Sequence, residues 1–178
     1  NAIYFKGAWE QPFSADQTTE GLFHPTVEEE IPVQMMHQKS LFSYYEDDHL
    51  QLLELPYAGG NLSMVVLLPK EISGITGLED SLTPDRLASW TAGLTETEVN
   101  VALPKFELSF PFRLDESLQS MGVTDAFTGQ ADFSGMEESR ELYLGAVLHK
   151  AFVSVNEEGT EAAAATAVIL QTKSVSFM

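Results

Sequence analysis

The chain has 178 residues, of which 44% are hydrophobic, so it can bury the core of one domain or a large part of a bigger one. Its 27 Asp and Glu against 9 Lys and Arg give a net charge of −18, which makes nucleic acids and anionic membrane surfaces poor partners. There is no cysteine, which excludes disulfides, thiolate catalysis and Cys-ligated zinc.

Strand patterns dominate the chain. They are short, apolar or alternating runs, found at residues 2–5, 29–36, 40–46, 50–57, 62–69, 98–110 and 141–157. The turn Gly59-Gly60-Asn61 predicts that 50–57 and 62–69 form a hairpin. Residues 64–68 are apolar at every position, which predicts a strand covered on both faces.

Two helices are expected among these strands. One is predicted near 84–92, because Thr83 is a good N-cap, Pro84 suits the first helical position, and Trp90 follows at helical spacing. The other is predicted near 114–121 and ends at Gly122. A weaker helical turn covers 75–82. The pattern indicates an α+β chain, and no repeat or linker marks an internal domain boundary.

No catalytic or metal-binding motif is visible. The histidines, His24, His37, His49 and His149, form no HExxH and no pair at metal-ligand spacing, so we expect no metal and no cofactor. Three acidic residues in a row at 28–30 are typical of a solvated surface. Asn61 begins a glycosylation sequon, which has meaning only in a secreted protein. The compartment is not identified, although an extracellular one is favoured.

The stretch from Gly159 onward raises a question of conformation. Its alanines favour a helix, and a helix or a frayed end remains the simple alternative. In an extended chain, alternate side chains from Thr160 to Leu170 point one way and start small, whereas Glu161 and its alternates point the other way. Such a segment could enter between two existing strands.

Several motifs together make the chain resemble an inhibitory serpin over its whole length. They are NAIYFKGAW at 1–9, LPKFEL at 103–108, ADFSGM at 131–136 and LHKAFVSVNEEGTEA at 148–162, in the family's order. The resemblance implies a partial serpin fold, a large mixed sheet with smaller sheets and a few helices. Residues 1–178 would form part of one domain, with the hinge and reactive loop at 156–178. The N-terminal helices and the strands after the loop are not in this chain, and the remaining segments of the same serpin would be its partners.

The resemblance also implies a function, which is inhibition rather than catalysis. In the family, a protease attacks an exposed loop and forms an acyl-enzyme, and the loop then inserts into the main sheet and traps the protease. The hinge of that loop matches ten residues here: Glu157, Glu158, Gly159, Thr160, Glu161, Ala162, Ala163, Ala164, Ala165 and Thr166. In the family, the cleaved bond follows the fourteenth residue after the hinge glycine; counted from Gly159 that residue is Lys173, so the resemblance implies a reactive bond at Lys173–Ser174. A lysine there implies a trypsin-like serine protease as partner; a slip in register would select Thr172 or Gln171.

Five residues are expected to control the opening of the sheet. Glu157 and Lys105 would pair at one end of it, with Trp9 covering the same region. Asn1 and His149 would form a polar pair beneath its centre. From the residues alone, the first pair could equally be a solvated one, and His149 an ordinary core histidine.

Two other functions stay open. The first is a non-inhibitory serpin that acts as a carrier, chaperone or storage protein. Bulky or charged residues at the inward hinge positions would block insertion and indicate such a protein. In this chain the inward positions hold small residues, which favours inhibition: Thr160, Ala162, Ala164 and Thr166. An acidic hydrolase would need paired carboxylates in a motif, and none is present. We expect residues 160–172 to be exposed if the loop is intact, and to form a strand inside the sheet if it has been cut near Lys173.

Overall fold

The computed structural model describes residues 2–138 and 141–172. These residues separate into two compact units: the hinge unit, comprising Lys6–Glu107 and Ser154–Glu161, and a second unit made of the other described residues. No linker or change of composition marks this division in the sequence. The mixture of sheets and short helices confirms the expected α+β class. None of the described helices has the length and apolar character needed to cross a lipid bilayer.

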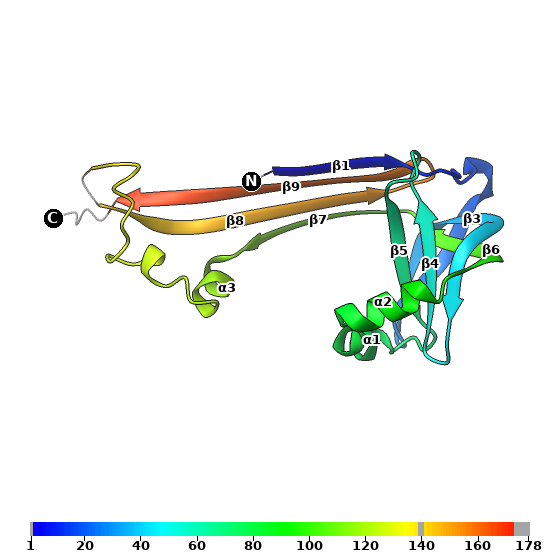
Figure 1. The fold of residues 1–178 in the computed structure, drawn as a ribbon. Coiled ribbons are helices and arrows are strands. Elements are labelled where there is room, and N and C mark those ends of the chain that lie inside the picture. Colours follow the sequence, from blue (N-terminus) through cyan, green and yellow to red (C-terminus); the bar gives the residue numbers. More distant parts are fainter. Residues whose placement is uncertain (1, 139–140, 173–178) are drawn as a thin grey trace. The chain divides into compact units, whose positions relative to one another are not determined.

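One sheet contains residues 159–172 as a strand, which is the form expected for a loop cut near Lys173 and not the exposed form expected for an intact loop (Figure 1). Its order is β1-β9-β8-β7, so β9 lies between β1 and β8. The bounds of these strands are β1 Ala2–Ala8, β7 Phe106–Arg113, β8 Leu142–Val155 and β9 Gly159–Thr172. The alanine-rich run is therefore extended, and the helical alternative is wrong for this structure.

The other sheet lies in the hinge unit and is antiparallel. Its order is β2-β3-β4-β5, and β6 also pairs with β3. The strands are β2 Thr18–Thr26, β3 Glu29–Glu46, β4 Leu50–Pro56, β5 Ser63–Pro69 and β6 Thr95–Pro104. The two strands predicted at 29–36 and 40–46 are a single long strand, because β6 pairs with β3 continuously from Met35 to Tyr44.

The expected hairpin is confirmed by the pairing of β4 with β5. Gly59 and Gly60 have φ angles of 100° and 69°, a left-handed conformation that glycine adopts without steric cost. The expectation that 64–68 is covered on both faces is wrong here, since Val65 and Leu68 are 40% and 54% exposed. β5 is an edge strand of its sheet, and from it Leu67 packs against the core cluster that contains Leu52.

The predicted helices are present. α2 spans Pro84–Ala92, and the Thr83 side chain accepts a hydrogen bond from the Arg86 amide. α3 spans Asp115–Ser120, and the weaker turn is α1, Ile75–Ser81. Trp90 anchors α2 on Leu50 and Leu52 in the core of the hinge unit.

The strand predicted at 98–110 is broken at Lys105. β6 ends at Pro104 and pairs with β3, whereas β7 begins at Phe106 and belongs to the sheet that contains β9. Lys105 bridges the two strands, and its amide donates to the Gln34 carbonyl at 2.8 Å. The pairing of β6 and β7 with their sheets, together with this hydrogen bond, holds the backbone of Lys105 in place.

Candidate functional site: the turn between β8 and β9

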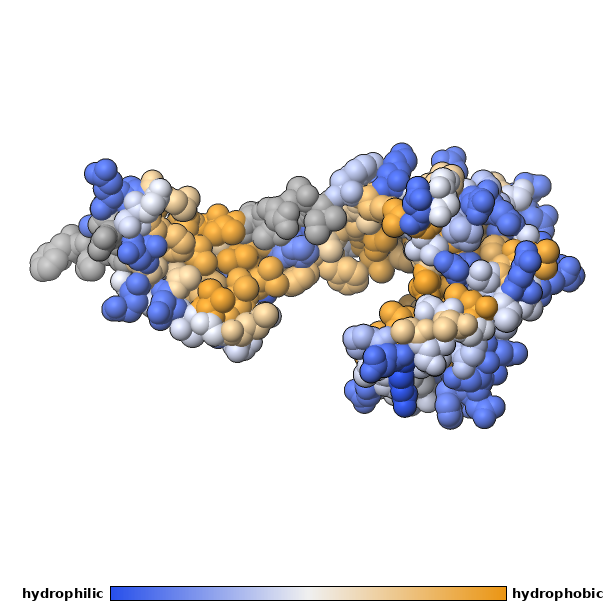
Figure 2. Space-filling model, in the orientation of Figure 1, coloured by the Kyte–Doolittle hydropathy of each residue, from blue (hydrophilic) through white to orange (hydrophobic). Residues whose placement is uncertain are grey.

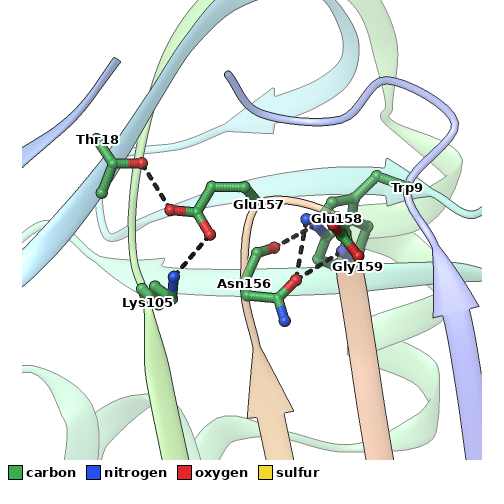
Figure 3. A network of polar contacts seen from close by, with 7 residues as sticks. All are labelled: Trp9, Thr18, Lys105, Asn156, Glu157, Glu158 and Gly159. Atoms are coloured by element: carbon green, nitrogen blue, oxygen red, sulfur yellow. Dashed lines mark hydrogen bonds and ion pairs between the residues drawn. The ribbon is translucent and has the colours of Figure 1, made fainter. Parts of the chain in front are cut away.

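A short turn joins the ends of β8 and β9 in the hinge unit (Figure 3). The Asn156 amide donates to the Gly159 carbonyl at 3.0 Å. The Asn156 side-chain oxygen accepts from the Glu158 amide at 2.9 Å and from the Gly159 amide at 3.2 Å. A side chain that accepts a bond from the backbone two residues on forms an Asx turn, which fixes the path of the chain at this point.

Glu157 projects from this turn and links two other parts of the hinge unit. One carboxylate oxygen accepts from Lys105 Nζ at 2.9 Å, and the other accepts from the Thr18 hydroxyl at 3.0 Å. The predicted proximity of Lys105 and Glu157 is confirmed. The Glu157 side chain is only 15% exposed, but Lys105 is 46% exposed, so the ion pair alone stabilises the fold by about 0–1 kcal/mol.

The hydrogen bond from Lys105 holds the pKa of Glu157 below its ordinary value of 4.5, and the hydrogen bond from Thr18 acts in the same direction. Burial of the carboxyl opposes both effects. Glu157 is therefore ionised near neutral pH, and its two oxygens act as acceptors there.

Trp9 lies over the other side of the turn. It is 3% exposed and stacks on Tyr57, with ring centroids 4.8 Å apart. The indole Nε1 donates to the Asn156 carbonyl at 2.9 Å, and the Trp9 amide donates to the Glu158 carbonyl at 2.9 Å. Burial raises the pKa of Tyr57. Trp9 thus contacts the same turn as Glu157, as the resemblance implied.

Gly159 is required for a steric reason. A Cβ atom built there would collide with the Gly7 carbonyl oxygen and would come within 2.8 Å of the Ala8 Cα. Its φ is not in the left-handed region, so the glycine is not needed for a positive φ. The glycine lets the start of β9 approach β1 closely.

The first side chains of β9 alternate as expected for an inserted strand. Thr160 is 5% exposed, whereas the Glu161 side chain is 43% exposed and lies 3.7 Å from Lys6 Nζ. A one-residue slip would bury the Glu161 carboxylate. Farther along, Val168 and Ile169 are both exposed, so the alternation is clear only at the start of the strand.

The other predicted residues are not brought to this turn. Asn61 is exposed in the β4–β5 turn. His149 is half-buried in the second unit, where its ring lies 4.8 Å from that of Phe112. Asn1 and the reactive bond, Lys173–Ser174, lie outside the described residues, as do the side chains of Ala164, Ala165 and Thr166.

Sequence reasoning gave no site role to Thr18 or Asn156, although Asn156 lies in the hinge predicted at 156–178. Thr18 opens a strand that was not predicted, and no local signal connects it with a residue so far along the chain. Asn156 did have a signal, because asparagine before a tight turn favours an Asx turn. Within residues 2–138 and 141–172, no cluster of three or more His, Asp or Glu side chains is arranged to hold a metal ion.

Comparison with known proteins identifies the family. The family model described as Serpin (serine protease inhibitor) matches residues 1–177. Serpin B3 from Homo sapiens is 49% identical over 173 residues, with 95% of this chain and 44% of that protein covered. The leukocyte elastase inhibitor of Sus scrofa is 46% identical over 177 residues, covering 95% and 47%.

Solved structures agree with the sequence comparisons. The structure of reaction-loop-cleaved lamprey angiotensinogen has a TM-score of 0.87 and 34% identity, with 96% of this chain and 53% of that chain covered. The chain spans about half the length of the relatives it matches. The match over nearly all of its residues, in sequence and in fold, shows that the chain belongs to the serpin family.

Proposed function

We propose that the protein containing this chain is a serine protease inhibitor that acts as a suicide substrate. The observation that carries the proposal is the position of β9 between β1 and β8, with Thr160 buried and Glu161 at the surface. A strand at this position is what an inserted reactive loop would form. The family description and the inhibitor named among the relatives support inhibition rather than catalysis as the proposed activity.

The proposed reaction begins at Lys173. The serine of the protease attacks the Lys173 carbonyl carbon, the bond to Ser174 breaks, and the amine of Ser174 leaves with a proton. The loop, now free at one end, enters the sheet as β9 and carries the acylated protease with it. Inhibition results if insertion is faster than hydrolysis of the ester, so the outcome is a kinetic competition.

The turn residues would control when the sheet opens. Glu157, held by Lys105, and Trp9, bonded to the turn, are proposed to keep this end of the sheet ordered. His149 and Asn1 are proposed to act as the polar pair beneath the centre of the sheet. These roles rest on the resemblance and, for the first three residues, on the contacts described above.

The choice of protease rests on Lys173. A lysine before the cleaved bond suits a specificity pocket with a carboxylate, as in trypsin-like enzymes. A relative is named as an elastase inhibitor, so an elastase is the natural second protease to test. The proposal predicts faster trapping of trypsin than of elastase.

The remaining segments of the same serpin are proposed as further partners. Hydrophobic residues cover much of the visible face of the second unit in Figure 2, and Phe110 and Phe112 on β7 are 56% and 47% exposed. Monomeric proteins rarely leave large apolar patches uncovered. The other half of the serpin would cover this face.

The test uses full-length protein mixed with trypsin or with elastase and separated on a denaturing gel. We expect a trypsin complex that survives denaturation, and loss of that complex when Lys173 is replaced by Ala. Complete cleavage without a complex for either protease would refute inhibition and would favour the non-inhibitory serpin. A complex with elastase alone would refute the assignment of Lys173.

A further inference from the structure

The β8–β9 turn departs from the usual pattern of a two-residue hairpin. In that pattern the two flanking residues exchange both of their backbone N–H···O bonds. Here Asn156 and Gly159 flank Glu157 and Glu158, and the Asn156 amide does donate to the Gly159 carbonyl at 3.0 Å. The reverse bond goes elsewhere, because the Gly159 amide donates to the Asn156 side chain at 3.2 Å.

Because the Gly159 amide bonds the Asn156 side chain, the main-chain carbonyl of Asn156 is left to accept a hydrogen bond from a different donor. The Asn156 main-chain oxygen accepts from the Trp9 indole at 2.9 Å (Figure 3). Trp9 is 3% exposed, and a buried indole N–H needs an acceptor. The side-chain oxygen thus replaces the main-chain oxygen in closing the turn, and both Gly159 and Trp9 are satisfied. The same side-chain oxygen also accepts from the Glu158 amide.

We infer that Asn156 is a positioning residue for loop insertion, because its side chain closes the turn that sets the register of β9 while leaving its carbonyl to Trp9. This inference rests on the proposed function. The first residue after the turn is Gly159, where an added Cβ would collide with Gly7 and Ala8, so β9 begins in close contact with β1. Because the turn sets the register of β9, it determines that Thr160 is buried and that Glu161 lies at the surface.

The chemistry of the residue suggests its own variants. Asn156→Ala removes the acceptor, so the Gly159 amide must compete with the Trp9 indole for one carbonyl. Asn156→Asp keeps an oxygen at the same place, and a carboxylate accepts backbone N–H bonds at least as well. Asn100 on β6 is exposed, so Asn100→Ala is a matched control for the loss of an asparagine side chain.

The first measurement is the number of inhibitor molecules consumed per trypsin molecule trapped by the full-length protein. We expect Asn156→Ala to raise it about 5- to 10-fold, as loss of a neutral hydrogen bond at the insertion step would do. Asn156→Asp and Asn100→Ala should stay within about twofold of the parent, by the same scale. An unchanged value for Asn156→Ala, or a defect in Asn156→Asp as large as that in Asn156→Ala, would overturn the inference.

A second measurement tests the link with Trp9. Trp9→Phe removes the indole donor, so it should raise the consumption less in the Asn156→Ala background than in the parent. Equal effects in both backgrounds would show that the two residues act independently, which would overturn the inference.

The two proposals fail in distinguishable ways. A parent that traps no protease refutes the proposed function. Amide exchange of the loop-cleaved protein then still tests the turn: Gly159 should exchange about tenfold faster in Asn156→Ala than in the parent, in line with one lost hydrogen bond. Unchanged exchange there would refute the turn itself.

Discussion

Replacing Thr160 with Arg tests whether β9 becomes an inserted strand. Thr160 is 5% exposed, so a guanidinium at this position would have to leave water as the strand enters the sheet. The effective cost of burying an unpaired charge is several kcal/mol. If about 3 kcal/mol of it is felt at the insertion barrier, insertion slows on the order of 100-fold. Hydrolysis of the acyl-enzyme is then faster than insertion, so the protease cleaves and releases the variant as a substrate.

The assay is the ratio of covalent complex to cleaved product on a denaturing gel after mixing full-length protein with trypsin. Thr160→Val is the control, because valine keeps the shape and the strand preference without adding a charge. We expect Thr160→Val to behave like the parent and Thr160→Arg to give cleaved, released protein. If Thr160→Arg traps trypsin as well as the parent does, the insertion mechanism is wrong for this protein.

Three further predictions concern other contacts. Gly159→Ala should destabilise the loop-inserted form by about 1–3 kcal/mol, because the new methyl forces β9 away from β1; an unchanged denaturation midpoint of the cleaved protein would contradict this. Glu157 has a pKa below 4.5 in the folded chain, so the stability it contributes is present above pH 4.5 and is lost as the pH falls through that lowered pKa. Glu157→Gln should therefore flatten the acid limb of a stability–pH profile, whereas an unchanged limb would assign that limb to other groups. Asp115 accepts from the Val147 amide at 2.6 Å, so Asp115→Ala should lower the thermal midpoint more than Asp115→Asn, which keeps an acceptor oxygen; equal midpoints would show that the bond contributes nothing.

Local signals predicted the elements that local chemistry determines. The Gly59-Gly60 turn and the Thr83-Pro84 cap are settled by backbone preferences within a few residues, and both are present in the structure. The alternation after Gly159 likewise predicted that Thr160 would be buried and that Glu161 would remain partly exposed.

Features that depend on distant partners were missed or misjudged. β3 is continuous because β6 pairs along it, and the break at Lys105 arises because the two strands on either side join different sheets. Thr18 reaches Glu157 across 139 positions of sequence, which no local pattern can indicate. The apolar run at 64–68 predicts a strand covered on both faces, but an apolar run alone does not show how many of its faces pack against a neighbouring element.

The pairing of Lys105 with Glu157 depends on residues far apart in the sequence, yet it was predicted correctly. Neither residue's local context indicates a partner, and the expectation came from the matching of LPKFEL and the hinge with a family pattern. The structure supplies the physical basis, since Lys105 lies at the junction of β6 and β7 and Glu157 at the turn that follows β8.

The central claim is that the protein traps a protease through Lys173 and then inserts β9. The most direct measurement is peptide mapping by mass spectrometry of the complex formed between the full-length protein and trypsin. The account predicts a peptide that ends at Lys173 esterified to the catalytic serine of trypsin, together with a released fragment that begins at Ser174. An acyl bond at any other residue, or a cleaved protein with no ester to the protease, would contradict it.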